Sequence, residues 1–388
     1  MRIHLPLLPA VLGLLALASS AQKLELYTGA SAAWEVPTNP SLACGSGNFT
    51  YDAATRVLSY DVQATGFATA VSAAHIHDGD VGVGGPIIVS MTGGPASWIG
   101  SSAPLSAAQE ADLLREGFYV NIHTAAFGEG EIRGQIVAPT NFRSPADGSQ
   151  MVPPIATSAT AQGTYFLDQS TGALTYHVEA IGLSAPMSQA HIHDAPAGVP
   201  GPVAFPLVPT GAATWSGTTA PLSTAQKIDL LTEGLYLNIH TATYGGGEIR
   251  GQILVGSLNT DTAGLSVTNG CSQRLFLDAG RANAGANYWV VGTLSGTTPG
   301  VIAPGGLPVP VNPDFYFDHT IANPNSPPMT LSMSTLDGNG QGTCTFTFPA
   351  GAFPGLAGQQ MHHAFALIDV AAAAVELTSN AEDLVLVP

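Results

Sequence analysis

Short runs of alternating apolar and polar residues recur along the chain and predict β-strands. Three of them are TRVLSYDVQATG (55–66), TGALTYHVEAIG (171–182) and GTCTFTFPAG (342–351), set among glycine, proline and asparagine turn signals. A period of two places alternate side chains on opposite faces of a strand, so one face can be buried. The chain is therefore expected to be all-β.

One short helix is expected at each of two places. Ser106 with Gln109, and Ser223 with Gln226, have the spacing of a capping box, and Gly117 and Gly234 lie near the expected helix ends. Such a helix would cover a sheet or one open end of it. The runs FYVNIHT and GEIRGQIV that follow predict two paired strands joined by a glycine turn.

An internal repeat sets the domain organisation. Residues 104–136 align without gaps to residues 221–253, with 24 of 33 positions identical. A separation of about 116 residues has the length of a whole domain. We expect two tandem β-sandwich or flattened-barrel domains at 22–140 and 141–257. The pattern then changes, which predicts a third, C-terminal β-sandwich at 258–388.

The first 21 residues predict a secretory signal peptide. They contain Arg2, an apolar run over 5–18 and small residues up to Ala21, after which cleavage is expected. The apolar run is too short to span a bilayer comfortably. We therefore expect a secreted, extracellular or periplasmic protein without a membrane span.

The charge balance narrows the choice of partners. The chain carries 10 Lys and Arg against 27 Asp and Glu, a formal net charge of −17, and removal of Arg2 leaves 9 − 27 = −18. Phosphate backbones and anionic membranes require clustered basic residues, so neither is an expected partner. A metal ion and an extracellular protein or surface both stay open as partners.

Three cysteines are too few for a disulfide scaffold. Cys271 and Cys344 both lie in the last third, and we expect that they can pair in an oxidising compartment. Cys44 would then be a buried free thiol.

The candidate chemistry lies in four histidines within two copies of H-I-H-D, at 75–78 and 191–194. Alternate residues of a strand share a face, so each pair presents two imidazoles side by side. A third histidine recurs in each N-I-H-T, on a different strand. Three imidazoles favour copper or zinc. The metal-ligand candidates are His75, His77, His123, His191, His193 and His240.

A structural interpretation of the same histidines stands beside this one. Duplicated sequences share residues by ancestry, and a histidine near a strand edge can hydrogen-bond a backbone carbonyl. Asp78 and Asp194 can orient such a ring or form an Asx-turn. The two interpretations differ in geometry, because metal binding requires the three side-chain nitrogens to converge within about 3–4 Å.

The combination of motifs resembles the CHRD domain, first named from chordin. It consists of A-H-I-H-D with G-x-x-G-P, then Y-x-N-I-H-T and G-E-I-R-G-Q-I, in both copies. The first copy has EVPTNP where the family usually has a double proline. The resemblance implies an extracellular β-fold and no defined chemistry.

The order of histidines also resembles copper/zinc superoxide dismutases. That likeness would make His75, His77 and His123 copper ligands with Arg133 beside them, and His191, His193, His240 and Arg250 their second set. The chain departs from that family because no histidine lies between Asp78 and Ile122, where the bridging and zinc ligands would be expected. The family's paired cysteines are also missing.

Other polar residues have simpler interpretations. Glu131 with Arg133, and Glu248 with Arg250, are expected to form cross-strand ion pairs. His362 and His363 are adjacent, so they face opposite ways on a strand and are expected to be core or surface residues. No nucleophile elbow, P-loop or zinc-protease motif is present in the sequence.

The sequence therefore favours a secreted, non-catalytic protein with two CHRD-type domains, each with a three-histidine copper or zinc site. The first alternative is a structural or adhesive extracellular protein that binds no metal. The second is a copper-dependent enzyme that handles superoxide.

Overall fold

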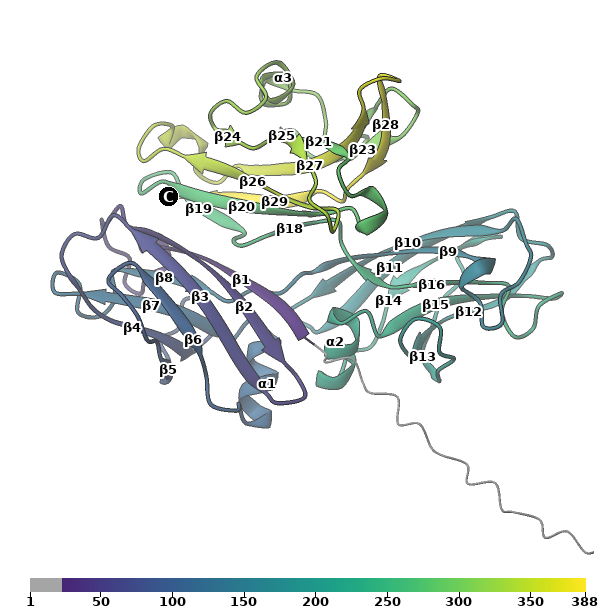
Figure 1. Cartoon of the computed structure of the whole chain (residues 1–388), viewed down its shortest axis with the longest axis horizontal. Helices are drawn as coiled ribbons and strands as arrows, with labels where there is room; N and C mark the ends of the chain where they lie inside the picture. The colour runs from purple at the N-terminus through teal and green to yellow at the C-terminus, as the bar shows by residue number, and fades with distance from the viewer. Residues whose placement is uncertain (1–22) are drawn as a thin grey trace, which may run out of the picture.

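The computed structural model describes residues 23–388, so the expected signal peptide lies outside the described residues. The described chain is all-β, with three short α-helices. Figure 1 shows three groups of strands, two of them formed by the repeats and the third, C-terminal, packed above them. This arrangement agrees with the all-β expectation.

The first repeat forms one eight-stranded sheet in the order β5-β4-β7-β8-β1-β2-β3-β6. Its elements are β1 (Lys23–Ser31), η1 (Ala32–Trp34), β2 (Cys44–Asp52), β3 (Val57–Thr65), β4 (Val71–Asp78), β5 (Ile87–Ser90), β6 (Ser97–Ser101), α1 (Ala107–Leu113), β7 (Phe118–Thr124) and β8 (Ile132–Gln135).

The second repeat reproduces this sheet in the order β13-β12-β15-β16-β9-β10-β11-β14, with β17 added beside β9. Its elements are β9 (Asn141–Asp147), η2 (Gly148–Gln150), β10 (Thr160–Asp168), β11 (Ala173–Ile181), β12 (Met187–Asp194), β13 (Val203–Pro206), β14 (Thr214–Thr218), α2 (Thr224–Leu231), β15 (Leu235–Thr241), β16 (Ile249–Gln252) and β17 (Leu254–Val255).

Both predicted capping boxes are present. Ser106 Oγ accepts a hydrogen bond from the backbone N–H of Gln109, and Gln109 Oε1 accepts one from the backbone N–H of Ser106. Ser223 and Gln226 form the same pair of hydrogen bonds. The alternating runs bury alternate side chains: in β3, residues Leu58, Tyr60, Val62 and Ala64 are buried. One continuous cluster of buried apolar residues runs through both repeats.

The C-terminal unit has its own core and two main sheets, in the orders β18-β20-β26-β24 and β19-β29-β27-β21-β25, with β28 beside β27. Its elements are β18 (Leu258–Thr260), β19 (Gly264–Ser266), β20 (Cys271–Asp278), η3 (Arg281–Asn283), β21 (Asn287–Thr293), β22 (Val301–Ile302), β23 (Pro308–Val309), α3 (Phe315–Ala322), β24 (Met329–Thr330), β25 (Met333–Thr335), β26 (Gln341–Phe348), η4 (Pro354–Leu356), β27 (Gln360–Asp369), β28 (Ala374–Thr378) and β29 (Glu382–Val387).

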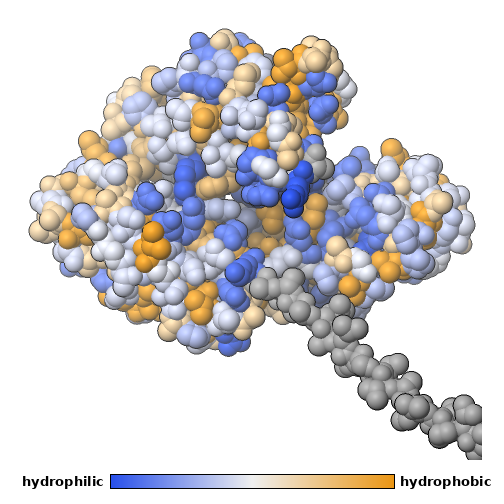
Figure 2. All heavy atoms as spheres, viewed as in Figure 1, coloured by the Kyte–Doolittle hydropathy of each residue, from blue (hydrophilic) through white to orange (hydrophobic). Residues whose placement is uncertain are grey.

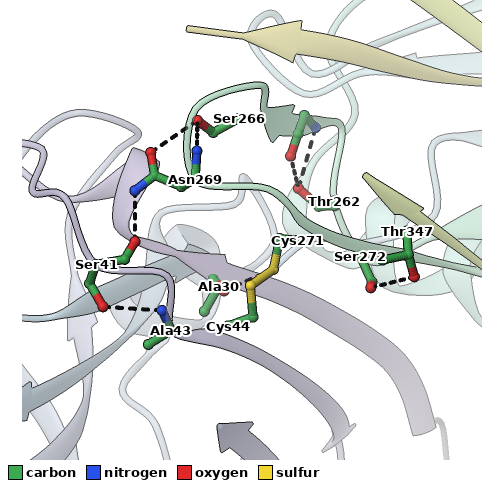
Figure 3. Close-up of a disulfide and its surroundings, with 11 residues drawn as sticks. Ala30, Ser41, Ala43, Cys44, Thr262, Ser266, Asn269, Cys271, Ser272 and Thr347 are labelled. Atoms are coloured by element: carbon green, nitrogen blue, oxygen red, sulfur yellow. Dashed lines mark hydrogen bonds between the residues drawn. A yellow bond between two sulfur atoms is a disulfide. The ribbon is translucent and has the colours of Figure 1, made fainter. Parts of the chain in front are cut away.

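The cysteine pairing differs from the expectation. Cys44, at the start of β2, is bonded to Cys271, at the start of β20, so the disulfide joins the first repeat to the C-terminal unit (Figure 3). Cys344 is the free thiol, fully buried in the core of the C-terminal unit, and burial raises its pKa to about 12. Proximity in the sequence was the wrong guide, because docking of the two units brings Cys44 to Cys271.

Further contacts join the first repeat to the C-terminal unit near this disulfide. Tyr27 of β1 stacks on Phe276 of β20 with ring centroids 4.1 Å apart, and Arg274 donates a hydrogen bond to the carbonyl of Gly47. Figure 2 shows a surface of mixed hydrophilic and hydrophobic residues, hollowed where the three units meet. A cleft of about 690 Å³ at this junction is lined by residues of all three, among them Glu25, Glu233 and Asp278.

Candidate metal centre

Strand pairing brings the three histidines of each repeat together. In the first repeat β4 is antiparallel to β7, with Ala73 opposite His123 and His75 opposite Asn121. His75, His77 and His123 therefore project from one face of the sheet, while Ile76 between the first two is fully buried on the other face. In the second repeat β12 and β15 place His191, His193 and His240 in the same way.

The rings converge on a common point in both repeats. In each triad, one nitrogen per ring lies within 4.8 Å of the other two. His191 Nδ1 is 3.2 Å from His240 Nε2, and the ring centroids of His75 and His123 are 5.1 Å apart. Three nitrogens bonded to one ion at about 2.0–2.1 Å lie about 3.3–3.6 Å apart in tetrahedral or trigonal geometry, so a pair at the 4.8 Å limit would have to close by about 1.2–1.5 Å on binding.

Backbone carbonyls fix which nitrogen faces inward. His77 Nδ1 lies 2.9 Å from the carbonyl oxygen of Gly85, and His123 Nδ1 lies 3.0 Å from that of Gly128. A carbonyl only accepts, so each Nδ1 carries the proton and each Nε2 keeps a free lone pair. These two Nε2 atoms and His75 Nδ1 are buried and have no hydrogen-bond partner.

The second repeat holds its rings by the same contacts. His193 Nδ1 is 2.9 Å from the Gly201 carbonyl, and His240 Nδ1 is 3.0 Å from the Gly245 carbonyl. His193 Nε2 is buried without a partner. Carbonyl oxygens on the second ring nitrogen are typical of histidines that bind metals, because they set the tautomer and orientation of the ring.

Burial disfavours the protonated form of four of these six imidazoles. Desolvation is the main cause that lowers the pKa of His75, and the neighbouring His123 and His77 lower it further. Desolvation likewise lowers the pKa of His77, of His191 and of His193. A neutral imidazole retains the lone pair that a metal needs, so these four rings could serve as ligands to a cation.

A tyrosine and an arginine support the buried histidine of each triad. Tyr119 stacks on His77 with centroids 4.9 Å apart, and the guanidinium of Arg133 lies 3.5 Å from the centre of the Tyr119 ring. Arg133 also donates hydrogen bonds to the carbonyls of Asp80 and Val83, in the loop that carries Gly85. The second repeat repeats the stack with His193, Tyr236 and Arg250.

The expectation of ion pairs between Glu131 and Arg133, and between Glu248 and Arg250, is wrong. Glu131 is fully buried, and its carboxylate accepts hydrogen bonds from Ser41 Oγ, Thr124 Oγ1 and the backbone N–H of Ala68. Glu248 has the corresponding hydroxyl donors Thr157, Ser184 and Thr241. Each carboxylate thus fixes the hairpin that carries His123 or His240, and each arginine fixes the loop after H-I-H-D.

Asp78 and Asp194 do not hold the rings, since the carbonyls of Gly85, Gly128, Gly201 and Gly245 take that place. The other histidines singled out behave as expected. His363 is fully buried, with Nε2 2.9 Å from the Tyr316 hydroxyl, and His362 faces Asp383.

The two triads differ in one neighbour. Glu35, just after η1, is buried near Asn121, and its Oε1 has no hydrogen-bond partner. Desolvation raises the pKa of Glu35 to about 7 against the opposing charge of Arg133. The second repeat has Met151 at the corresponding place after η2. The first repeat thus has a carboxyl group next to Asn121, at a position where the second repeat has a methionine side chain.

The family assignment rests on a sequence profile. The profile of the CHRD domain matches residues 27–136 and 142–253, more than half of the chain. The chain belongs to the CHRD domain family. Each CHRD domain contains one complete histidine triad. A comparison with curated proteins gave no match. Between residues 23 and 388, no helix has the length and apolar character that a membrane crossing requires.

Sequence reasoning missed several supporting residues. The stacking tyrosine stands in the repeated Y-x-N-I-H, so its recurrence in both CHRD domains was a usable signal. Glu35 occurs in one domain only, and the carbonyl contacts involve the backbone. Neither carries a sequence signal of its own.

Proposed function

We propose that each CHRD domain binds one copper or zinc ion through its histidine triad and that the protein acts without catalysing a reaction. The ligands are His75, His77 and His123 in the first domain and His191, His193 and His240 in the second. One observation carries this proposal: in each domain one ring nitrogen from each of three histidines lies within 4.8 Å of the other two, and four buried ring nitrogens of these six histidines have no hydrogen-bond partner.

A purely structural role accounts less well for this geometry. A structural histidine is stabilised when both ring nitrogens are hydrogen-bonded, and an unsatisfied buried acceptor costs about 1–3 kcal/mol. In the first triad three buried ring nitrogens without a hydrogen-bond partner lie side by side. A cation would satisfy all of them at once, and imidazole suits both copper and zinc.

The proposal includes export and a division of the chain. Residues 1–21 would be removed as a signal peptide, with cleavage near Ala21 and release to an extracellular or periplasmic location. The mature chain would then comprise CHRD domains at 22–140 and 141–257 and a C-terminal β-sandwich at 258–388. The separate core of the C-terminal unit supports the last boundary.

Metal analysis of protein purified without a histidine tag tests the proposal. We expect close to two equivalents of copper or zinc per chain and almost none in His77→Ala/His193→Ala. The control is His177→Asp, which gives this exposed position the aspartate found at Asp61 in the first repeat. It should leave the metal content unchanged.

A second measurement tests metal binding even if the protein loses its metal during purification. Copper or zinc added to metal-free protein at 100 times its dissociation constant should stabilise the folded state by about 2.7 kcal/mol for each occupied site. Protein that is metal-free and melts at the same temperature with and without either ion would overturn the proposal. The histidines would then be structural.

A further inference from the structure

The C-terminal unit reaches the support of the first histidine triad directly. Next to the Cys44–Cys271 disulfide, Asn269 Nδ2 donates hydrogen bonds to the carbonyls of Asn39 (3.2 Å) and Ser41 (2.7 Å), as Figure 3 shows for Ser41. Ser266 Oγ donates to Asn269 Oδ1, which turns the amide N–H groups toward the first domain. The 39–44 segment is therefore held at both ends by the C-terminal unit.

This segment in turn holds the hairpin that carries His123. Ser41 Oγ donates to Glu131 Oε1 at 2.5 Å, and Asn39 Nδ2 donates to the carbonyls of Gly130 and Glu131. Glu131 Oε2 accepts from Thr124, the residue after His123. An uninterrupted series of hydrogen bonds thus runs from Asn269 to the strand end that positions His123.

The second CHRD domain lacks this connection. Thr160 stands at the start of β10, where the first domain has Cys44 at the start of β2, and Thr157 replaces Ser41 as the donor to Glu248. Within the described chain, no hydrogen bond or disulfide joins the 155–160 segment to the C-terminal unit. The two triads therefore have the same ligands and different support.

We propose that Asn269 and the Cys44–Cys271 disulfide position the ligands of the first histidine triad. Reduction of this disulfide would therefore weaken metal binding in the first CHRD domain and leave metal binding in the second domain unchanged. This inference rests on the proposed metal binding. Neither sulfur touches the histidines. They act by keeping Asn269 against the 39–44 segment, so that Glu131 and its hairpin stay fixed.

The redox step needs a dithiol reductant. One thiolate of the reductant attacks a sulfur of the Cys44–Cys271 bond, which breaks and forms a mixed disulfide. The second thiolate of the reductant then displaces that cysteine. The protein gains two electrons and two protons as two thiols, and the reductant becomes a disulfide. Both cysteines are only partly buried, which leaves them open to attack.

The test measures zinc affinity one triad at a time, because zinc does not change oxidation state. His193→Ala/His240→Ala leaves only the first triad, and His77→Ala/His123→Ala leaves only the second. Each background is combined with one of two changes. Cys44→Thr/Cys271→Ser removes the disulfide and gives position 44 the residue that the second repeat has at Thr160. Asn269→Ala removes the hydrogen bonds to the 39–44 segment and keeps the disulfide. Competition with a chromophoric chelator gives the dissociation constants.

We expect both changes to weaken zinc binding at the first triad about tenfold or more, as loss of supporting residues commonly does, and to leave the second triad within about twofold. In metal-free protein, amide hydrogen exchange should accelerate at 39–44 and 122–131 but not at 155–160 and 239–248. If the cysteine variant does not fold, Asn269→Ala and dithiol-treated wild type give the same comparison.

An unchanged dissociation constant at the first triad would overturn the inference, as would equal weakening at both triads, which indicates general loosening. If neither zinc nor copper binds in either background, the proposed function is overturned instead. The hydrogen-exchange comparison would then still decide whether the C-terminal unit supports the hairpin.

Discussion

The buried histidine of the C-terminal unit gives a quantitative prediction about pH. His363 is fully buried, its Nε2 faces the Tyr316 hydroxyl, and its Nδ1 has no partner. Desolvation, with a smaller contribution from His362, lowers the pKa of His363 from 6.5 to about 3. The unfolded chain therefore takes up this proton at a higher pH than the folded chain. The resulting loss of stability begins near pH 6.5 and is complete near pH 3.

The magnitude follows from the two pKa values. Each pKa unit corresponds to about 1.36 kcal/mol, so the full effect is about 5 kcal/mol, and about 2 kcal/mol of it falls between pH 7 and pH 5. Glu382 opposes this trend in the wild type, because burial raises its pKa to about 8 and its stability contribution grows as pH falls. The difference between wild type and His363→Phe separates the two groups.

The free thiol of Cys344 reports unfolding of this unit alone, since it is buried there. Urea titrations at pH 7 and pH 5, with labelling by a pyridyl disulfide reagent, give the free energy of unfolding. His363→Phe should cost about 1–3 kcal/mol at pH 7, because the Tyr316 hydroxyl loses its partner. Relative to wild type, it should then recover about 2 kcal/mol at pH 5. His362→Gln is the control. A pH-independent difference would refute the reasoning.

Three further predictions concern the other parts of the chain. Gly130→Ala should destabilise the first CHRD domain by several kcal/mol, because φ of Gly130 is +137° and an added Cβ would overlap two buried side chains. Gly128 has open space around it, so Gly128→Ala should cost about 1 kcal/mol or less. Thermal melts of the two variants test the difference. In the native protein, the buried thiol of Cys344 should resist labelling, because burial raises its pKa to about 12. Protein unfolded without reductant should carry one label, at Cys344. Two or more labels per chain in intact-mass spectra would contradict the Cys44–Cys271 disulfide. Glu35→Met introduces the residue that the second repeat has at Met151. It should stabilise the protein relative to wild type by an amount that grows from pH 4.5 to pH 7 and reaches about 3 kcal/mol, because folding of the wild type keeps a carboxyl group buried whose pKa is raised to about 7. A difference in melting temperature between variant and wild type that does not change with pH would contradict that pKa.

Local patterns in the sequence determined much of this protein. Period-two alternation predicted the strands, the serine and glutamine spacing predicted both capped helices, and the repeat predicted two equivalent β-domains. The same alternation put His75 and His77 on one face, because Ile76 between them must enter the core. These features depend on neighbours in the chain, so the sequence expresses them directly.

Only the tertiary structure decided which distant groups meet. The register of β4 against β7 brings His123 to the pair, and the loop after β4 supplies the Gly85 carbonyl that orients His77. Glu131 bonds to hydroxyls and not to Arg133, and Cys44 bonds to Cys271 across two units. Strand register and the docking of units depend on packing between segments far apart in the chain, which no local pattern records.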